Sequence, residues 1–243
     1  GGLITVPFLF FIFESLNVDP NYLMHLAVGT SFSIIITTSG VSVYTHKKHN
    51  AVNLSIIKSY GLFVILGVLS GTIFAAALDT KSLLLFFTVI VYFLGAYLLN
   101  LKDKASKIKA NFNLLPRVVF GFASGFISAP MGIGGAVMNV PILRYFGYPI
   151  NKAIGSAAAI GLIIASFGAI GFLITGSYLN VNLPLSIGFI NIPAFLIFIP
   201  ITMFMARVGA NTVHKLNKSK IQKFFGIFLY VVGTIFLYRY LVI

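Results

Sequence analysis

The chain has 243 residues, of which 58% are hydrophobic and only 9% are charged. Soluble domains carry about 25% charged residues, so this composition excludes a soluble globular protein. The chain contains no cysteine, which excludes disulfides, thiol catalysis and thiolate metal sites. The formal net charge of +13 does not indicate nucleic acid, because the basic residues lie in short segments between apolar runs.

The chain opens on a helix-breaking motif that occurs twice. Residues 1–9 read GGLITVPFL, and the pattern returns at residues 135–143 as GAVMNVPIL. Each copy interrupts a strongly apolar stretch, and a bilayer tolerates such loosened backbone only where it lines a protein cavity. A duplicated helix break is a strong sequence indicator of a transport site. About twenty apolar residues precede the second copy, from Leu114 onward, so we expect a comparable segment to be missing before Gly1.

Ordinary apolar spans follow each motif. They cover residues 25–45, 55–78 and 82–101 in the first half, and 153–175, 185–206 and 221–242 in the second. A helix needs roughly 20 apolar residues to cross the hydrocarbon core, and these runs reach that length. Barrel strands would instead read as short alternating segments. The sequence predicts an all-α polytopic membrane protein.

The two halves resemble each other beyond the motif. AVGTS at residues 27–31 aligns with AIGSA at residues 153–157. At a single offset of 138, further residues match in order: Gly71 with Gly209, Leu78 with Leu216, Phe86 with Phe224, Phe87 with Phe225, Tyr92 with Tyr230, and Gly95 with Gly233. We interpret the chain as two repeats, 1–101 and 114–243, joined by a basic cytoplasmic linker at 102–113.

The segment 114–147 allows two topologies, because it is too long for one straight span and too short for two. It crosses as a broken, inclined helix, or it is a re-entrant hairpin of two half-helices meeting at residues 129–135. If the segment crosses, the two faces hold nine and eight Lys or Arg residues. If it is re-entrant, one face holds fifteen and the other only Lys81 and Arg239. Short loops normally show a strong bias, so we favour the hairpin.

The hairpin topology has a consequence for the repeats. One re-entrant segment plus three spans is an odd number of crossings, so the second repeat would be inverted relative to the first. The two glycine motifs would then enter from opposite faces and meet near the midplane, as in alternating-access transporters. The face poor in basic residues would also hold three of the four carboxylates: Glu14, Asp19 and Asp79.

The glycines of the second motif are candidate ligands for an anion. Gly132, Gly134 and Gly135 let a ligand approach the main chain. A half-helix that starts after them presents unpaired N–H groups and the positive end of its dipole, which bind anions. The helix begins either directly after the glycines or nearer Val140, because Asn139 is a good N-cap residue. The alternative is that the glycines only permit close helix packing.

Hydroxyl groups near the breaks are the other candidates, since neutral donors can bind an oxyanion and still release it. Their alternative role is bonding to their own or a neighbouring helix. The predicted substrate-binding residues are Gly1, Gly2, Thr5, Thr30, Ser31, Ser128, Gly132, Gly134, Gly135, Asn139 and Ser156. No carboxylate lies mid-span and the histidines flank loops, so the sequence predicts no catalytic residue, no metal site and no cofactor.

The motifs resemble those of a known family. Residues 125–143 followed by 153–156 resemble the sulfite exporter TauE/SafE family, and residues 1–31 resemble the other copy of its motif. The resemblance covers nearly the whole chain and implies a bacterial inner-membrane permease for sulfur-containing anions such as sulfite or organosulfonates. The chain departs from the pattern in two places. Ala136 stands where the family often has a third glycine, and residues 157–159 are alanines where the first half has hydroxyls.

We therefore expect a secondary transporter that moves a small anion by alternating access, and not an enzyme. It would lie in the lipid bilayer of the bacterial cytoplasmic (inner) membrane, with no nucleic-acid partner. Two alternatives stay open: a permease for a non-sulfur small anion or metabolite, and a non-transporting membrane scaffold or intramembrane enzyme. The sequence leaves the transport direction, the coupling ion and the oligomeric state open, with a homo-oligomer among the options.

Overall fold

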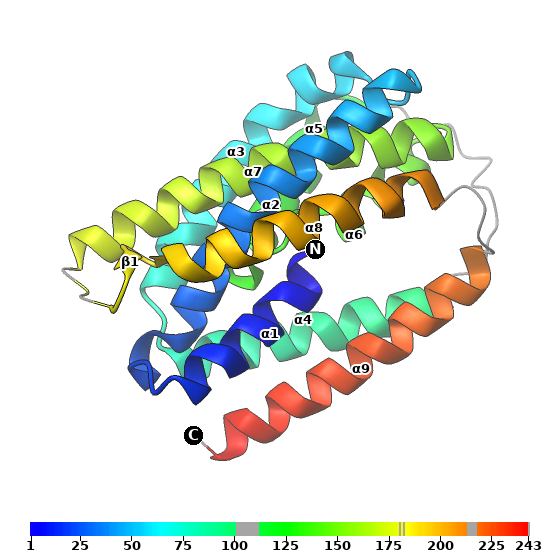
Figure 1. Ribbon diagram of the computed structural model, residues 1–243. Coiled ribbons are helices and arrows are strands. Elements are labelled where there is room, and N and C mark those ends of the chain that lie inside the picture. The colour runs from blue at the N-terminus through cyan, green and yellow to red at the C-terminus, as the bar shows by residue number, and fades with distance from the viewer. Residues whose placement is uncertain (101–111, 180, 182, 213–217, 243) are drawn as a thin grey trace.

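A computed structural model describes residues 1–100, 112–179, 181, 183–212 and 218–242 (Figure 1). Seven of the described helices are long and apolar enough to cross a membrane by length and composition. This confirms an all-α polytopic membrane protein. Most of the predicted linker, with the four lysines at 102, 104, 107 and 109, lies outside the described residues.

The helices follow the predicted spans closely. In chain order they are α1 (Gly2–Ser15), the short 3-10 helix η1 (Pro20–Tyr22), α2 (Leu23–Lys48), α3 (Leu54–Ala76), α4 (Thr80–Asn100), α5 (Leu114–Met131), α6 (Ala136–Tyr145), α7 (Ile150–Tyr178), α8 (Ile192–Thr212) and α9 (Lys218–Val242). The strands β1 (Ser186–Ile187) and β2 (Ile190–Asn191) form a tight antiparallel turn. Because of that turn, α8 begins at Ile192 rather than at residue 185.

The helix ends gather at two ends of the bundle, which differ in charge. At the basic end, the loop between α2 and α3 meets the start of α7, since the Asn53 N–H donates to Ser156 Oγ at 3.0 Å. The described basic residues of this end are Lys47, Lys48, Lys58, Arg117, Arg144, Lys152, Arg207 and Lys223. At the acidic end, the Thr80 hydroxyl donates to the Asn21 carbonyl at 2.8 Å. Glu14, Asp19 and Asp79 lie at this end.

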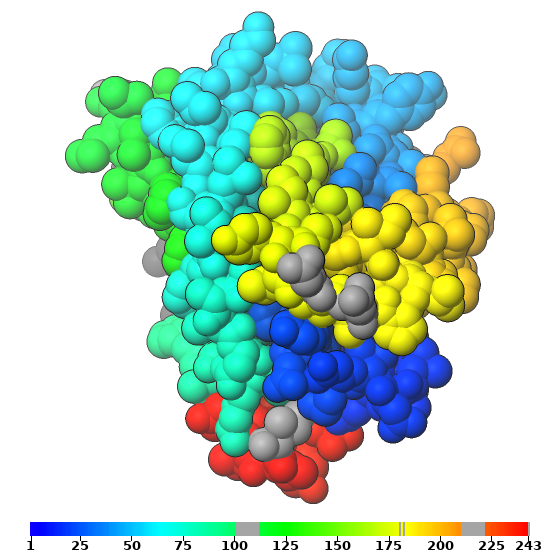
Figure 2. All heavy atoms as spheres, turned by 90° about the vertical axis from the view of Figure 1, so that its left-hand side faces the viewer, coloured from blue at the N-terminus to red at the C-terminus, as the bar shows by residue number. Residues whose placement is uncertain are grey.

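Figure 2 faces the acidic end. The α1–α2 connection, in dark blue, lies between the yellow region of the β1–β2 turn and the red end of α9. Ring contacts agree with this arrangement, because the Tyr22 and Phe189 ring centroids are 5.7 Å apart. Asp79 stands just before α4 here, and its side chain accepts a hydrogen bond from the Ser82 N–H. Hydrogen bonding to Ser82 lowers the pKa of the Asp79 carboxyl.

Helices α5 and α6 fold back on each other. The ring of Phe146, just after α6, lies 4.5 Å from that of Phe112 and 5.8 Å from that of Phe120, which stand before and within α5. The start of α5 and the end of α6 therefore lie together at the basic end, while their other ends meet at residues 132–135. These contacts support the predicted hairpin. Its re-entrant placement in a bilayer, and the inverted relation of the two repeats, stay predictions.

The two longest helices form the centre of the bundle. In α2 and α7, 56% of the candidate span is buried inside the protein, against 6% in α8. They cross closely at small residues: a Cβ added to Gly168 would lie 2.8 Å from the Phe32 ring. Helices α4 and α9 pair along one edge, and the chain begins in the middle of the bundle (Figure 1). The protein thus has a central α2–α7 pair onto which the motif helices pack.

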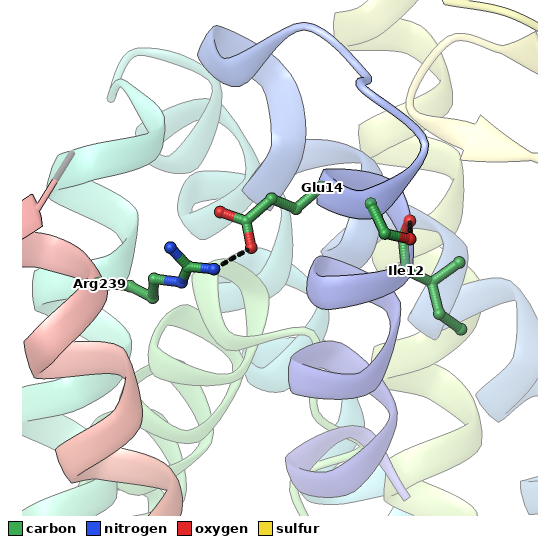
Figure 3. Close-up of polar contacts among 4 residues, drawn as sticks. Ile12, Glu14 and Arg239 are labelled. Carbon is green, nitrogen blue, oxygen red and sulfur yellow. Dashed lines mark hydrogen bonds and ion pairs between the residues drawn. The ribbon is translucent and has the colours of Figure 1, made fainter.

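An ion pair ties α1 to α9 at the acidic end. Arg239 Nη2 donates to Glu14 Oε2 at 2.7 Å, with side-chain exposures of 32% and 26% (Figure 3). Partial exposure limits its strength to about 1 kcal/mol. We predict that Glu14→Gln and Arg239→Gln each lower the melting temperature slightly, and that the double variant costs no more than either single one. Thermal melts of the four proteins form the double-mutant cycle. Additive losses would contradict a direct interaction.

Candidate functional site

The break between α5 and α6 depends on two glycines in the left-handed region. Gly132 ends α5 at φ 62°, and Gly135 precedes α6 at φ 65°. Residues with a side chain rarely adopt this backbone conformation, and neither position has room for a Cβ atom. A Cβ on Gly132 would lie 2.7 Å from Val6 Cγ2, and one on Gly135 would clash with Ile164 Cδ1. Because α6 begins at Ala136, a helix start nearer Val140 is wrong.

The two glycine motifs contact each other. A Cβ on Gly2 would collide with the Gly132 carbonyl oxygen and lie 2.8 Å from Ile133 Cα. Ser31 Oγ donates to the same Gly132 oxygen at 3.0 Å, so α2 also contacts the junction of the two motifs. Helix α1 runs from this junction to the acidic end, and α6 runs from it to the basic end. The first residues of α1 and the N-terminal end of α6 therefore lie at one place, beside the C-terminal end of α5.

The start of α6 carries unused hydrogen-bond donors. The Met138 and Asn139 N–H groups bond to the Gly135 carbonyl, whereas those of Ala136 and Val137 make no hydrogen bond within the described part of the chain. Ser128 Oγ is fully buried and also has no partner there. It lies 3.2 Å from where a Cβ on Gly135 would stand. A neutral hydroxyl and free N–H groups at a helix N-terminus form a site that suits an anion.

Asn139 fixes the shape of the break. Its Nδ2 donates to Ser124 Oγ at 2.8 Å and to the Gly135 carbonyl at 2.9 Å. Its Oδ1 accepts a hydrogen bond from the Tyr60 hydroxyl at 2.8 Å. The side chain is buried and occupied by these partners, which belong to α3, α5 and the break itself. The geometry therefore gives Asn139 a positioning role at the site. Tyr60 and Ser124 were not among the residues that the sequence predicts.

Thr30 and Ser156 lie away from this junction. Each hydroxyl accepts a hydrogen bond from the N–H of a loop asparagine, and we call these two matching contacts the clasps. Thr30 Oγ1 accepts the N–H of Asn191 at 2.9 Å, as Ser156 Oγ accepts that of Asn53. The glycine before each hydroxyl is in close contact with a loop carbonyl, Gly29 with Phe189 and Gly155 with Ala51.

Each asparagine then caps the following helix. Asn53 Oδ1 accepts the Ser55 N–H, and Asn191 Oδ1 accepts the Ala194 N–H, both at 3.0 Å. The two asparagines stand at an offset of 138, which also relates Gly71 to Gly209, whereas Thr30 and Ser156 stand at an offset of 126. The pairing of the two asparagines was thus visible in the sequence, and the division into two repeats stays a prediction.

We predict that Thr30→Val destabilises the protein because it leaves the Asn191 N–H without an acceptor. The expected cost is about 1–3 kcal/mol, and Ser156→Ala should cost a similar amount at Asn53. Thermal unfolding in detergent measures both. Ser33→Ala is the matched control, since Ser33 is on the same helix and bonds only to the Gly29 carbonyl of its own turn. Equal melting temperatures for Thr30→Val and Ser33→Ala would show that the clasp contributes nothing.

The remaining predicted residues are three at the start of α1 and Gly134 in the break. Thr5 Oγ1 donates to the Gly1 carbonyl at 3.2 Å within its own turn. Gly1 is exposed, while Gly2 and Thr5 are buried near the junction. Gly134 is half-buried, and a Cβ there would lie 3.2 Å from Ile35. The structure therefore brings Gly2, Ser31, Ser128 and the three glycines of the break together, and leaves Thr30 and Ser156 apart.

Known proteins share this chain's sequence over most of its length. The family model described as sulfite exporter TauE/SafE matches residues 1–236. A probable membrane transporter protein of Haemophilus influenzae is 32% identical over 235 residues, covering 96% of this chain and 88% of the relative. A probable membrane transporter protein of Methanocaldococcus jannaschii is 26% identical over 247 residues, covering 98% of this chain and 87% of the relative.

No solved structure matches the chain significantly. The sequence matches nevertheless extend over both glycine motifs and six of the seven candidate spans in full. Since the family model covers nearly every residue, and the fold is a bundle of apolar helices with broken segments at its centre, the chain belongs to the sulfite exporter TauE/SafE family and is a membrane transporter.

Proposed function

We propose that this protein is a secondary transporter of a small anion, most suitably a sulfur oxyanion or organosulfonate such as sulfite. The observation that carries the proposal is the buried Ser128 hydroxyl beside the Ala136 and Val137 N–H groups at the start of α6, none of which has a hydrogen-bond partner among the described residues. These donors can replace the hydration of an oxyanion. They carry no full charge, so the bound anion can also leave.

The charge pattern supports an anion over a cation. Three of the four carboxylates, Glu14, Asp19 and Asp79, lie at the acidic end, and Asp103 lies outside the described residues. None of the side chains described at the junction is acidic. The choice of a sulfur-containing anion comes from the family, whose description names a sulfite exporter. A site made of backbone N–H groups and a hydroxyl suits sulfite and sulfonate groups, which present several acceptor oxygens.

The convergence of α1 and α6 supports alternating access. The two motif helices begin at one junction and run to opposite ends of the protein. If the repeats are inverted and the α5–α6 hairpin is re-entrant, a site at the junction can open to either face by equivalent movements. The proposed location is the bacterial cytoplasmic membrane, with the basic end on the cytoplasmic side. The driving force would be a solute or ion gradient, and the protein would perform no catalysis.

Flux into proteoliposomes tests this function. We expect uptake of labelled sulfite or a small organosulfonate above that of empty liposomes, and weaker uptake of a monocarboxylate. Ser128→Ala should raise the half-saturation concentration about tenfold or more, since a hydrogen bond to a charged group contributes about 1.5–3 kcal/mol. Ser70→Ala is the control, because Ser70 is half-buried in α3 and its hydroxyl bonds to the Leu66 carbonyl of the same helix.

Each alternative has its own result. Uptake of the monocarboxylate alone would favour a permease for a non-sulfur anion. Uptake of none of the anions, with folded protein in the liposomes, would contradict the proposed function and favour a scaffold. Equal half-saturation for Ser128→Ala and Ser70→Ala would exclude Ser128 as a ligand.

A further inference from the structure

A pocket at the basic end lies between α2 and α8. It has a volume of about 560 Å³. Its lining residues are Gly40, Val41, Tyr44, Thr45, Lys48, His49 and Arg207. The pocket is large enough for a small anion with part of its hydration shell. It lies apart from the glycine junction and none of the predicted substrate-binding residues lines it.

The lining of this pocket is cationic. Lys48 and Arg207 approach it from two different helices, and His49 adds a third basic group. None of its lining residues is acidic. Lys48 Nζ stands 4.6 Å from the centroid of the Tyr44 ring, which holds the ammonium group at the pocket wall. Two cations that line one concave space raise the local concentration of anions.

Helix α2 leads from the pocket to the glycine junction. Residues 31–35 are fully buried, and residues 36–43 are half-buried. The half-buried stretch contains hydroxyl side chains at Thr37, Thr38, Ser39 and Ser42. Ser39 Oγ lies 3.7 Å from where a Cβ on Gly161 would stand, and that same Cβ would lie 2.5 Å from the Gly134 carbonyl oxygen. Ser39, which precedes the pocket residue Gly40, therefore lies close to the break.

We propose that this pocket is an anion-binding vestibule, which captures the free oxyanion at the basic end before it moves along α2 to the junction. The inference rests on the proposed function and extends it to a second site, built by Lys48 and Arg207. The same chemistry would suit the phosphate of an anionic lipid headgroup. We assign the pocket to a soluble oxyanion, because its lining residue Gly40 directly follows Ser39, which lies close to the break at Gly134.

The test is concentration-dependent sulfite flux with the substrate supplied at the basic end. The double variant Lys48→Gln/Arg207→Gln should raise the half-saturation concentration about tenfold and leave the maximal rate within about twofold. Half-saturation from the acidic end should not change. The matched control is Lys47→Gln/Lys58→Gln, which removes the same charge from the same end, outside the pocket. Arg207→Lys should retain most of the affinity.

Equal shifts in the pocket and control variants would overturn the vestibule, because they would reflect only general surface charge. An effect of the pocket variant that occurs in liposomes with anionic phosphatidylglycerol, but not in liposomes of phosphatidylcholine alone, would overturn it in favour of a lipid site. The vestibule would also be overturned if the control variant transports normally and the pocket variant has the same half-saturation concentration as the unaltered protein. The proposed function would then stand. Absence of flux in the unaltered protein would instead refute the proposed function.

Discussion

Replacing Gly135 with alanine should abolish anion flux. Gly135 holds φ 65°, and an L-residue in the left-handed region costs about 1–2 kcal/mol. The new Cβ would clash with Ile164 Cδ1 and lie 2.9 Å from Asn139 Nδ2. It would also stand 3.2 Å from Ser128 Oγ, so the start of α6 must move away from the hydroxyl that we propose as a ligand. The initial rate of sulfite uptake per reconstituted protein measures the effect.

Gly209→Ala is the matched control for this prediction. A Cβ on Gly209 would meet no atom within 4 Å, and its helix should gain roughly 0.5–1 kcal/mol from the added methyl group. We expect normal flux from this variant. If Gly135→Ala also transported at the rate of the unaltered protein, the conformation of the break would have no role in transport.

Asn139→Leu should give the largest loss of stability among the substitutions considered. Leucine is close in size but removes the side-chain hydrogen bonds to the Ser124 hydroxyl, the Gly135 carbonyl and the Tyr60 hydroxyl. The Gly135 carbonyl keeps its backbone N–H donors and the Tyr60 hydroxyl keeps the Phe120 carbonyl. Since each lost hydrogen bond contributes about 1 kcal/mol, we expect a total of about 3 kcal/mol. For a chain of this length that corresponds to a decrease of roughly 6–12 °C in melting temperature.

Tyr60→Phe separates the parts of this network. It removes only the bond to Asn139 Oδ1 and that to the Phe120 carbonyl, which the same hydroxyl contacts at 3.0 Å. Its melting temperature should lie between those of Asn139→Leu and the unaltered protein. A melting temperature for Asn139→Leu within 1–2 °C of the unaltered protein would show that the network does not hold the break.

The helical spans could be predicted because apolar length is a strong signal in membrane proteins. Residues 25–45 and 153–175 fall inside α2 and α7, which extend a few residues further at both ends. The start of α8 was missed because the apolar sequence continues through residues 186–191, where the chain turns at Gly188 with φ 56°. A single glycine in an apolar run does not distinguish a turn from close helix packing.

The glycine break could also be predicted, but the partners of its polar groups could not. Hydroxyls in membrane helices bond to ligands, neighbouring helices or their own backbone, and the sequence looks the same in each case. The Ser128 hydroxyl has no partner in the part of the chain that the structure describes, whereas Thr30 and Ser156 accept hydrogen bonds from loop N–H groups. Tyr60 carried no local signal, since its partner Asn139 is distant in the chain.

The central claim is that an anion binds where the two glycine motifs meet, and Ala136→Cys tests it most directly. Ala136 is the exposed first residue of α6, and the chain has no native cysteine to interfere. We predict that saturating sulfite or organosulfonate slows modification of this cysteine by an anionic methanethiosulfonate reagent, while labelling at Tyr178→Cys, exposed at the acidic end, is unchanged. Labelling of Cys at position 136 at the same rate with and without the transported anion would contradict the claim.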